Sequence, residues 1–104
     1  LDCDGVLWRG AEPLPGAREA LAALRSSGVR TVFVTNNSSK SRAAAALKIA
    51  ELMQLDADEL DAHTDVVTAS FAAAHYLARV RDPPLSPADE VLVLADEGTA
   101  EELE

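Results

Sequence analysis

The chain alternates between stretches whose apolar residues recur every three or four positions and short runs that are apolar almost throughout. The first pattern is typical of helices with one buried face and covers residues 17–27, 42–53, 71–80 and those from 99 onwards. The second pattern is typical of buried parallel strands and covers residues 29–34, 65–68 and 91–94. Because strand, helix and strand in this order form a βαβ unit, the alternation predicts an α/β fold with a parallel sheet.

The helical stretches also predict N-caps and buried faces, because capping residues precede them and apolar stripes run along them. The expected N-caps are Ser41, Ser70 and Thr99. The expected buried positions are Ala43, Leu47, Ala50 and Met53 in the second helix and Ala73, Leu77 and Val80 in the third.

Proline and glycine mark the segments that cannot be regular. Residues 10–16 contain two prolines and two glycines, which predict a loop or small flap. Residues 82–87 contain three prolines and form the best linker in the chain. We therefore divide the chain into residues 1–87, the N-terminal part of a core domain, and residues 88–104, the beginning of a second domain. Residues 56–61 are strongly acidic and predict a solvated loop.

Composition and charge narrow the range of partners. The 104 residues carry 18 acidic and 9 basic side chains, a net charge of −9, which opposes binding to the phosphate backbone of nucleic acids. No stretch approaches the roughly 18 apolar residues of a membrane span, so we expect no membrane partner. A single cysteine excludes an intrachain disulfide and fits a cytoplasmic protein. Because the sequence starts on a candidate motif and stops within a helix, we expect a fragment of a longer protein.

Two carboxylates lie one residue apart in Leu1-Asp2-Cys3-Asp4-Gly5. If Leu1 ends a buried strand, Asp2 and Asp4 point to one side and Cys3 to the other, because strand side chains alternate faces. Gly5 permits a sharp turn that keeps both acids at the carboxyl end of the strand, where open α/β sheets bind ligands. Paired carboxylate oxygens suit Mg²⁺, so we predict that Asp2 and Asp4 form a metal site.

A run of small polar residues follows the next strand and suits phosphate. Thr35 supplies a hydroxyl, and the backbone amides of Asn36 and Asn37 can bind phosphate oxygens. We predict that Asp2 attacks a phosphoryl group to form an aspartyl-phosphate, while Asp4 protonates the leaving alkoxide and later deprotonates the attacking water. Because two carboxylates would repel a phosphate dianion, this chemistry requires a divalent cation, with Mg²⁺ as first choice.

Other interpretations of these residues are weaker. An EF-hand loop counted from Asp2 lacks the required glycine and the bidentate glutamate. A nucleophilic Cys3 has no histidine that the sequence places beside it. Trp8 is expected to lie within the flap rather than to bind substrate. Lys40 and Arg42 could face the phosphate, although cations at helix starts are usually only solvated.

Three motifs resemble those of one family. Asp-Cys-Asp-Gly-Val-Leu-Trp at 2–8, Pro-Gly-Ala at 15–17 and Phe-Val-Thr-Asn-Asn-Ser-Ser-Lys at 33–40 are similar to motifs of the haloacid dehalogenase (HAD-like) superfamily of hydrolases. The closer similarity is to its branch containing phosphoglycolate phosphatase, pyridoxal phosphate phosphatase and 4-nitrophenylphosphatases. The resemblance implies a Rossmann-like core and Mg²⁺-dependent hydrolysis of a small phosphorylated metabolite, with phosphoglycolate as the favoured substrate.

The same resemblance implies residue roles. Asp2 matches the family nucleophile and metal ligand, and Asp4 matches the acid/base, which binds Mg²⁺ through its backbone carbonyl. Thr35, Asn36 and Asn37 match the phosphate-binding second motif. The family's third motif, a lysine, and its fourth, an acidic pair, follow a cap domain and do not occur here, so we expect these 104 residues to be inactive alone.

The resemblance also implies partners and leaves alternatives open. The cap, of which residues 91–104 resemble only the beginning, often forms the contact in homodimers of related enzymes, so a homodimer is expected of the longer protein. The alternatives are a non-catalytic relative that binds a phosphorylated metabolite or a protein, and a phosphotransferase or mutase of the same superfamily.

Overall fold

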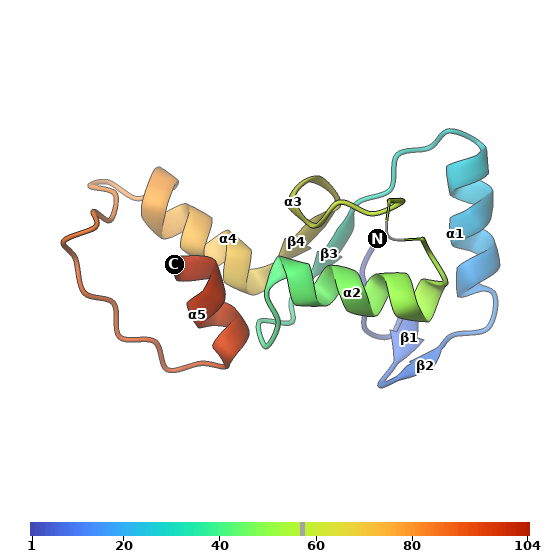
Figure 1. Ribbon diagram of the computed structural model, residues 1–104, viewed down its shortest axis with the longest axis horizontal. Coiled ribbons are helices and arrows are strands. Elements are labelled where there is room, and N and C mark those ends of the chain that lie inside the picture. The colour runs from blue at the N-terminus through green and yellow to red at the C-terminus, as the bar shows by residue number, and fades with distance from the viewer. Residues whose placement is uncertain (57) are drawn as a thin grey trace.

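A computed structural model describes residues 1–56 and 58–104, which extend over 47 × 27 × 20 Å. Figure 1 shows a packed end that contains the N-terminus and α1 and α2, and an opposite end where a long loop leads into α5. The elements in chain order are β1 (Trp8–Arg9), β2 (Glu12–Pro13), α1 (Ala17–Ser26), β3 (Phe33–Thr35), α2 (Arg42–Met53), α3 (Ala62–Asp65), β4 (Val66–Thr68), α4 (Ala69–His75), a π-helical segment (Tyr76–Val80) and α5 (Glu97–Leu103).

A small parallel sheet lies at the centre of the packed end. β3 and β4 run parallel, with Phe33 opposite Val66. The Leu1 ammonium donates to the Val32 carbonyl at 2.7 Å, and Val34 N–H donates to the Leu1 carbonyl at 2.8 Å. This is the hydrogen-bond pattern of a parallel pair, so Leu1 extends the sheet on the other side of β3. The prediction of an α/β fold with a parallel sheet is confirmed.

The strand predicted over residues 29–34 is shorter than expected and begins at Phe33. The backbone N–H of Val29 donates to the Leu24 carbonyl at 3.0 Å, so this residue still completes the end of α1. The predicted flap is an antiparallel hairpin of β1 and β2, in which Trp8 lies opposite Pro13. Gly10 makes its turn with a φ of 63°, in the left-handed region that favours glycine.

The core lies between the sheet, the two long helices and the first loop. Its most buried side chains are Cys3, Leu21, Phe33, Ile49 and Val66, each at most 2% exposed. Figure 1 shows α2 crossing beside β3 and β4, with α1 at the outer side of the same end. Burying side chains of this size contributes roughly 1.5–3 kcal/mol each relative to exposure. The buried core is therefore built from residues 3–66.

The buried face of α2 differs from the prediction. Ser41 is its N-cap as predicted, accepting from Ala44 N–H at 3.4 Å. The buried residues are Ala45, Ala46, Ile49 and Met53, so only Met53 of the expected stripe is correct. Leu47 is 74% exposed. Because α2 is rich in alanine, several apolar stripes were possible along it. The larger side chains of Ile49 and Met53, four residues apart, lie on the face that is buried.

The start and the inner face predicted for the third helix are also wrong. α4 follows β4 directly, and its N-cap is Thr68, whose hydroxyl accepts from Phe71 N–H at 3.1 Å. Ser70 instead lies buried on the helix and shares a 2.8 Å hydrogen bond with Thr68. Ala74 is buried, whereas the predicted Val80 is 60% exposed.

The acidic segment contains a short helix that the sequence pattern did not predict. Asp61 caps α3 by accepting from His63 N–H at 2.8 Å, and Asp65 ends that helix rather than starting the strand. Asp56, Asp58 and Glu59 are exposed as expected of a solvated loop. Residue 57 of this loop lies outside the described residues.

The C-terminal segment forms the predicted helix but not the predicted strand. Residues 91–94 have no strand partner within the part of the chain that the structure describes, and Leu92 and Leu94 are 83% and 88% exposed. A strand needs a neighbour for its backbone groups, so an apolar run alone does not make one. α5 begins at Glu97 with Asp96 as N-cap. The capping box at Thr99 is therefore wrong, and the division at residues 87 and 88 stays a prediction.

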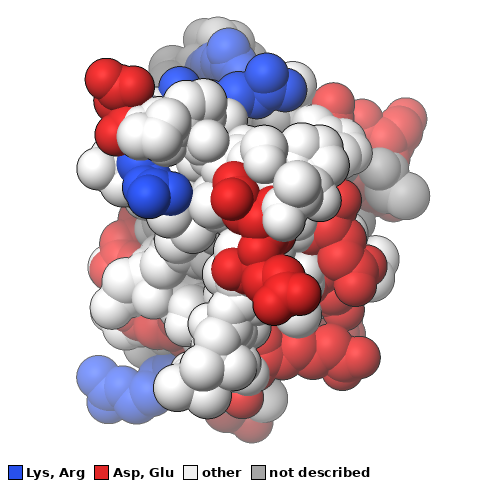
Figure 2. Space-filling view, turned by 90° about the vertical axis from the view of Figure 1, so that its left-hand side faces the viewer, with Lys and Arg blue, Asp and Glu red and all other residues white. Residues whose placement is uncertain are grey.

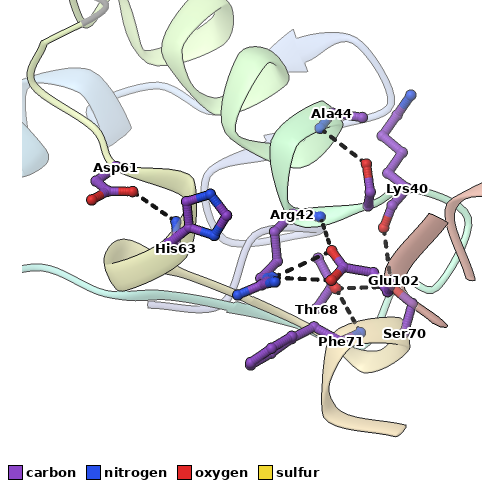
Figure 3. A network of polar contacts seen from close by, with 10 residues as sticks. Lys40, Arg42, Ala44, Asp61, His63, Thr68, Ser70, Phe71 and Glu102 are labelled. Carbon is purple, nitrogen blue, oxygen red and sulfur yellow. Dashed lines mark hydrogen bonds and ion pairs between the residues drawn. The ribbon is translucent and has the colours of Figure 1, made fainter. Parts of the chain in front are cut away.

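α5 is attached to the start of α2 by polar contacts that Figure 3 shows. Arg42 Nε lies 3.1 Å from Glu102 Oε2, and the Arg42 guanidinium lies 3.6 Å from the centroid of the Phe71 ring. Thr99 donates its hydroxyl hydrogen to the Ser38 carbonyl at 3.0 Å. Gly98 is buried against the backbone of Lys40. The last helix therefore rests on the turn that follows β3.

Charge is unevenly spread over the surface. Figure 2 shows the end of the molecule nearest α5, where acidic side chains cover much of one side and the basic ones lie toward the edges. Within residues 1–56 and 58–104, none of the helices has the length and apolar character that a membrane crossing requires.

Candidate active site

Asp2 and Asp4 are exposed, and Cys3 between them is 1% exposed. This is the alternation expected at the end of a strand. Asp2 Oδ1 accepts a hydrogen bond from Cys3 N–H at 2.8 Å. Burial, followed by the negative charges of Asp2 and Asp4, raises the pKa of the Cys3 thiol to about 11. The negative charges of both carboxylates thus reach the buried thiol and add to the effect of burial, which favours its neutral form.

The loop after the two acids is closed by its own backbone. The Cys3 carbonyl accepts from the N–H groups of Val6, Leu7 and Trp8 at 3.2, 2.9 and 3.3 Å. Gly5 has a φ of 82°, and its N–H donates to the Trp8 carbonyl at 2.7 Å. The sharp turn predicted at Gly5 is present, and it fixes the direction in which Asp4 leaves the backbone.

Trp8 connects the hairpin to the candidate acid. Its indole Nε1–H donates to Asp4 Oδ1 at 2.8 Å, and the side chain is 4% exposed, so the expected place within the flap is confirmed. Lys48 of α2 places its ammonium 4.7 Å from the centroid of the ring. The sequence reasoning missed both contacts. Lys48 lies beside Ala45 and Ile49 on the helix, so a correct prediction of the buried face of α2 would have placed Lys48 near the core.

Thr35 ends β3 and begins the expected phosphate turn. The side chain is 7% exposed, and its Oγ1 accepts from Asn37 N–H at 3.1 Å. Asn37 Oδ1 in turn accepts from the backbone N–H and the hydroxyl of Ser39, at 2.8 and 2.7 Å. Asn36 is exposed. The Asn37 amide is therefore engaged within the turn and would have to exchange partners to donate to a phosphate oxygen, whereas the Thr35 hydroxyl keeps its own hydrogen to donate.

A small cleft, here called the Asp4 cleft, brings several of these groups together. Its lining consists of Cys3, Asp4, Trp8, Thr35, Asn37, Lys40, Ala45, Lys48, Ile49 and Thr68. One predicted acid and two members of the predicted phosphate turn thus share a cavity with two lysines. Asp2 and Asn36 are exposed outside this lining, and Arg42 faces Glu102 instead.

The residues at this site fit Mg²⁺ in part. Asp2 and Asp4 supply the hard carboxylate oxygens that the ion prefers, and both are open to solvent. Among the residues that the structure describes, no group of three or more His, Cys, Asp or Glu side chains could enclose a metal ion. The two acids would hold a cation together with water and a substrate phosphate, which is the usual way Mg²⁺ is bound in phosphoryl-transfer sites.

Comparison with known sequences finds relatives that are named phosphatases. The chain is 45% identical to human glycerol-3-phosphate phosphatase over 103 residues, which is 99% of this chain and 32% of that protein. It is 42% identical to chloroplastic phosphoglycolate phosphatase 1A of Arabidopsis thaliana, over 99% of this chain and 26% of that protein. The chain therefore spans about a third or less of the length of these relatives.

Solved structures show the same relationship. The p-nitrophenyl phosphatase of Archaeoglobus fulgidus superposes with a TM-score of 0.79 at 28% identity, covering 98% of this chain and 35% of that one. The glycerol phosphate phosphatase of Mycobacterium tuberculosis, solved with magnesium, superposes with a TM-score of 0.75 at 36% identity, covering 98% and 28%. Residues 1–104 also match the sequence profile of the haloacid dehalogenase-like hydrolases. The chain belongs to the haloacid dehalogenase-like hydrolase family.

Proposed function

We propose that this chain supplies the nucleophile, the acid/base and the phosphate turn of an Mg²⁺-dependent phosphatase that hydrolyses a small phosphomonoester. The observation that carries the proposal is the pair of exposed acids, Asp2 and Asp4, beside the turn that starts at Thr35. The hydrogen bonds of Leu1 to β3 align these two segments at one edge of the sheet. That edge is where open α/β sheets bind ligands.

The proposed reaction has two steps, phosphoryl transfer to Asp2 and hydrolysis of the aspartyl-phosphate. An Asp2 carboxylate oxygen attacks phosphorus, the bond to the ester oxygen breaks, and Asp4 gives its proton to the departing alkoxide. Water then attacks the phosphorus of the aspartyl-phosphate, and its proton passes to Asp4. Inorganic phosphate leaves, and the Asp2 carboxylate is restored. Thr35 donates its hydroxyl hydrogen to a phosphate oxygen.

Asp2 and Asp4 would hold Mg²⁺, Asp4 through its backbone carbonyl. When bound, the ion offsets the repulsion between the carboxylates and the phosphate and stabilises the charge that develops during transfer. Lys48, which is half-buried, and Lys40, which is exposed, both line the Asp4 cleft and add positive charge there. The two lysines thus offset part of the repulsion between the carboxylates and a phosphate, in a chain whose net charge is −9.

The names of the relatives support small phosphomonoesters as the proposed substrate class. Phosphoglycolate is the favoured substrate, and the name of the human relative adds glycerol 3-phosphate as a second small phosphomonoester to test. The 104 residues alone are expected not to turn over substrate, because the lysine and the acidic pair that the family resemblance implies do not occur among them. A homodimer of the complete protein and a cytoplasmic location stay predictions.

The test is phosphate release by the complete product of the gene that encodes this chain. Activity with Mg²⁺, its loss on chelation, and loss of essentially all turnover in Asp2→Asn with an unchanged circular dichroism spectrum would support the proposal. Ordinary activity of Asp2→Asn would refute the mechanism. Binding of phosphoglycolate without turnover would favour the non-catalytic alternative, and transfer of the phosphoryl group to an acceptor other than water would favour the phosphotransferase.

A further inference from the structure

Trp8 bonds the candidate acid with its side chain and the neighbouring residue, Gly5, with its backbone. The Gly5 N–H donates to the Trp8 carbonyl at 2.7 Å, and the Trp8 indole N–H donates to Asp4 Oδ1 at 2.8 Å. The backbone bond closes the loop that carries Asp4, and the indole bond holds its carboxylate in one orientation. A hydrogen bond to one carboxylate oxygen also leaves the other oxygen to carry and deliver a proton.

The indole is itself held in place from both sides of the Asp4 cleft. Trp8 pairs with Pro13 across the hairpin and is 4% exposed. Lys48 of α2 lies over the ring face, 4.7 Å from the centroid, at the distance of a cation–π contact. The hairpin and α2 therefore fix the indole, and the indole fixes Asp4.

We propose that Trp8 is a positioning residue, whose indole N–H holds the Asp4 carboxyl in the orientation that protonates the leaving group. This proposal rests on the phosphatase function proposed above and adds a residue that touches neither phosphate nor metal. Its consequence is a dependence on the leaving group. An alkoxide needs the proton as it departs, whereas the stable 4-nitrophenolate anion leaves without one.

The experiment measures kcat/KM of the complete gene product with an alkyl phosphate, glycerol 3-phosphate, and with 4-nitrophenyl phosphate. This parameter reports the steps up to loss of the leaving group, so later hydrolysis of the aspartyl-phosphate does not mask the effect. Trp8→Phe keeps a buried ring and removes the N–H. We expect it to lose about tenfold or more with the alkyl ester and less than about threefold with the aryl ester, since general acid catalysis contributes roughly 10²–10⁴-fold.

Two further variants calibrate this result. Asp4→Asn removes the acid itself and should show the same selectivity for the leaving group, to a greater degree. Leu7→Ala removes a side chain that is 4% exposed on the same loop without touching Asp4, so it should lower both activities by the same factor. An equal loss with both esters in Trp8→Phe, or no loss with either, would overturn the positioning role.

The failure of this proposal is distinguishable from that of the proposed function. If the unaltered protein hydrolyses neither ester with Mg²⁺, the phosphatase function fails, and the role of Trp8 fails with it. If it is active but Trp8→Phe behaves like Leu7→Ala, only the positioning role is overturned.

Discussion

The ion pair between Arg42 and Glu102 should stabilise the fold by a measurable coupling energy, although the two residues are 60 positions apart. The side chain of Glu102 is 6% exposed and that of Arg42 is 19% exposed. Breaking a fully buried pair costs about 3–5 kcal/mol, and an exposed pair contributes about 0–1 kcal/mol. Because Arg42 keeps some contact with water, we expect a coupling energy of about 2 kcal/mol, within the range for residues in direct contact.

The assay is a double-mutant cycle of Arg42→Met and Glu102→Gln, with unfolding in urea followed by circular dichroism and by the fluorescence of the one tryptophan. Gln still accepts from the Arg42 backbone N–H, and Met keeps an apolar stem against Phe71, so the cycle isolates the charges. The pair of Arg30 and Asp65, 3.9 Å apart, is the control; because the Arg30 side chain is 72% exposed, this pair should couple by less than about 0.5 kcal/mol. A value as small for Arg42 and Glu102 would refute the reasoning.

Three further predictions concern single positions. In metal-free protein, Cys3 should react with iodoacetamide at least about a hundredfold more slowly than in the unfolded chain, because its pKa is raised to about 11. Because the folded state favours the neutral thiol, the free energy of unfolding should fall as the pH rises from about 9 to 11, and Cys3→Ala should not show this fall. Fast labelling of Cys3 in the folded protein would contradict both the slow reaction and the raised pKa. Gly98→Ala should release α5, because a Cβ atom would collide with the Lys40 backbone, whereas Glu101→Ala on the exposed face should leave α5 in place. Limited proteolysis should therefore cleave the C-terminus faster in Gly98→Ala than in Glu101→Ala, and equal cleavage rates would disprove the close approach. Thr68→Val, which removes a buried cap hydroxyl, should lower the free energy of unfolding by about 2 kcal/mol in urea denaturation, and an unchanged midpoint would show that the cap contributes nothing.

Features that depend on neighbouring residues were predicted well from the sequence. The alternation of Asp2, Cys3 and Asp4 follows from strand geometry, and the turn at Gly5 follows from its freedom to adopt a positive φ. The turn after Thr35 begins at the residue expected from its small polar side chains. The placement of the candidate site was therefore readable from short segments, while the roles of its residues stay predictions.

Features that depend on distant contacts were predicted poorly. The alanine-rich α2 offers several possible apolar stripes, and contact with the sheet selected the one through Ile49 rather than Leu47. Which of Thr68 and Ser70 caps α4 depends on where β4 stops, and that end is set by pairing with β3. The apolar run at residues 91–94 lacks a partner strand among the described residues, so its composition alone misled the prediction.

The contact between Trp8 and Asp4 shows a third limit. The two residues are only four positions apart, but their hydrogen bond depends on the closed loop around the Cys3 carbonyl and on the packing of α2. A sequence pattern predicts that a tryptophan is buried, and only the structure shows which group its N–H meets.

The central claim is that Asp2 carries the phosphoryl group during turnover. The most direct test mixes the complete gene product with Mg²⁺ and substrate, stops the reaction rapidly with acid, and locates the bound phosphoryl group by peptide mass spectrometry. We expect it on the peptide that contains Asp2, and we expect none in Asp2→Asn or after chelation of the metal. Product release with a phosphoryl group on another residue, or on none, would contradict the account.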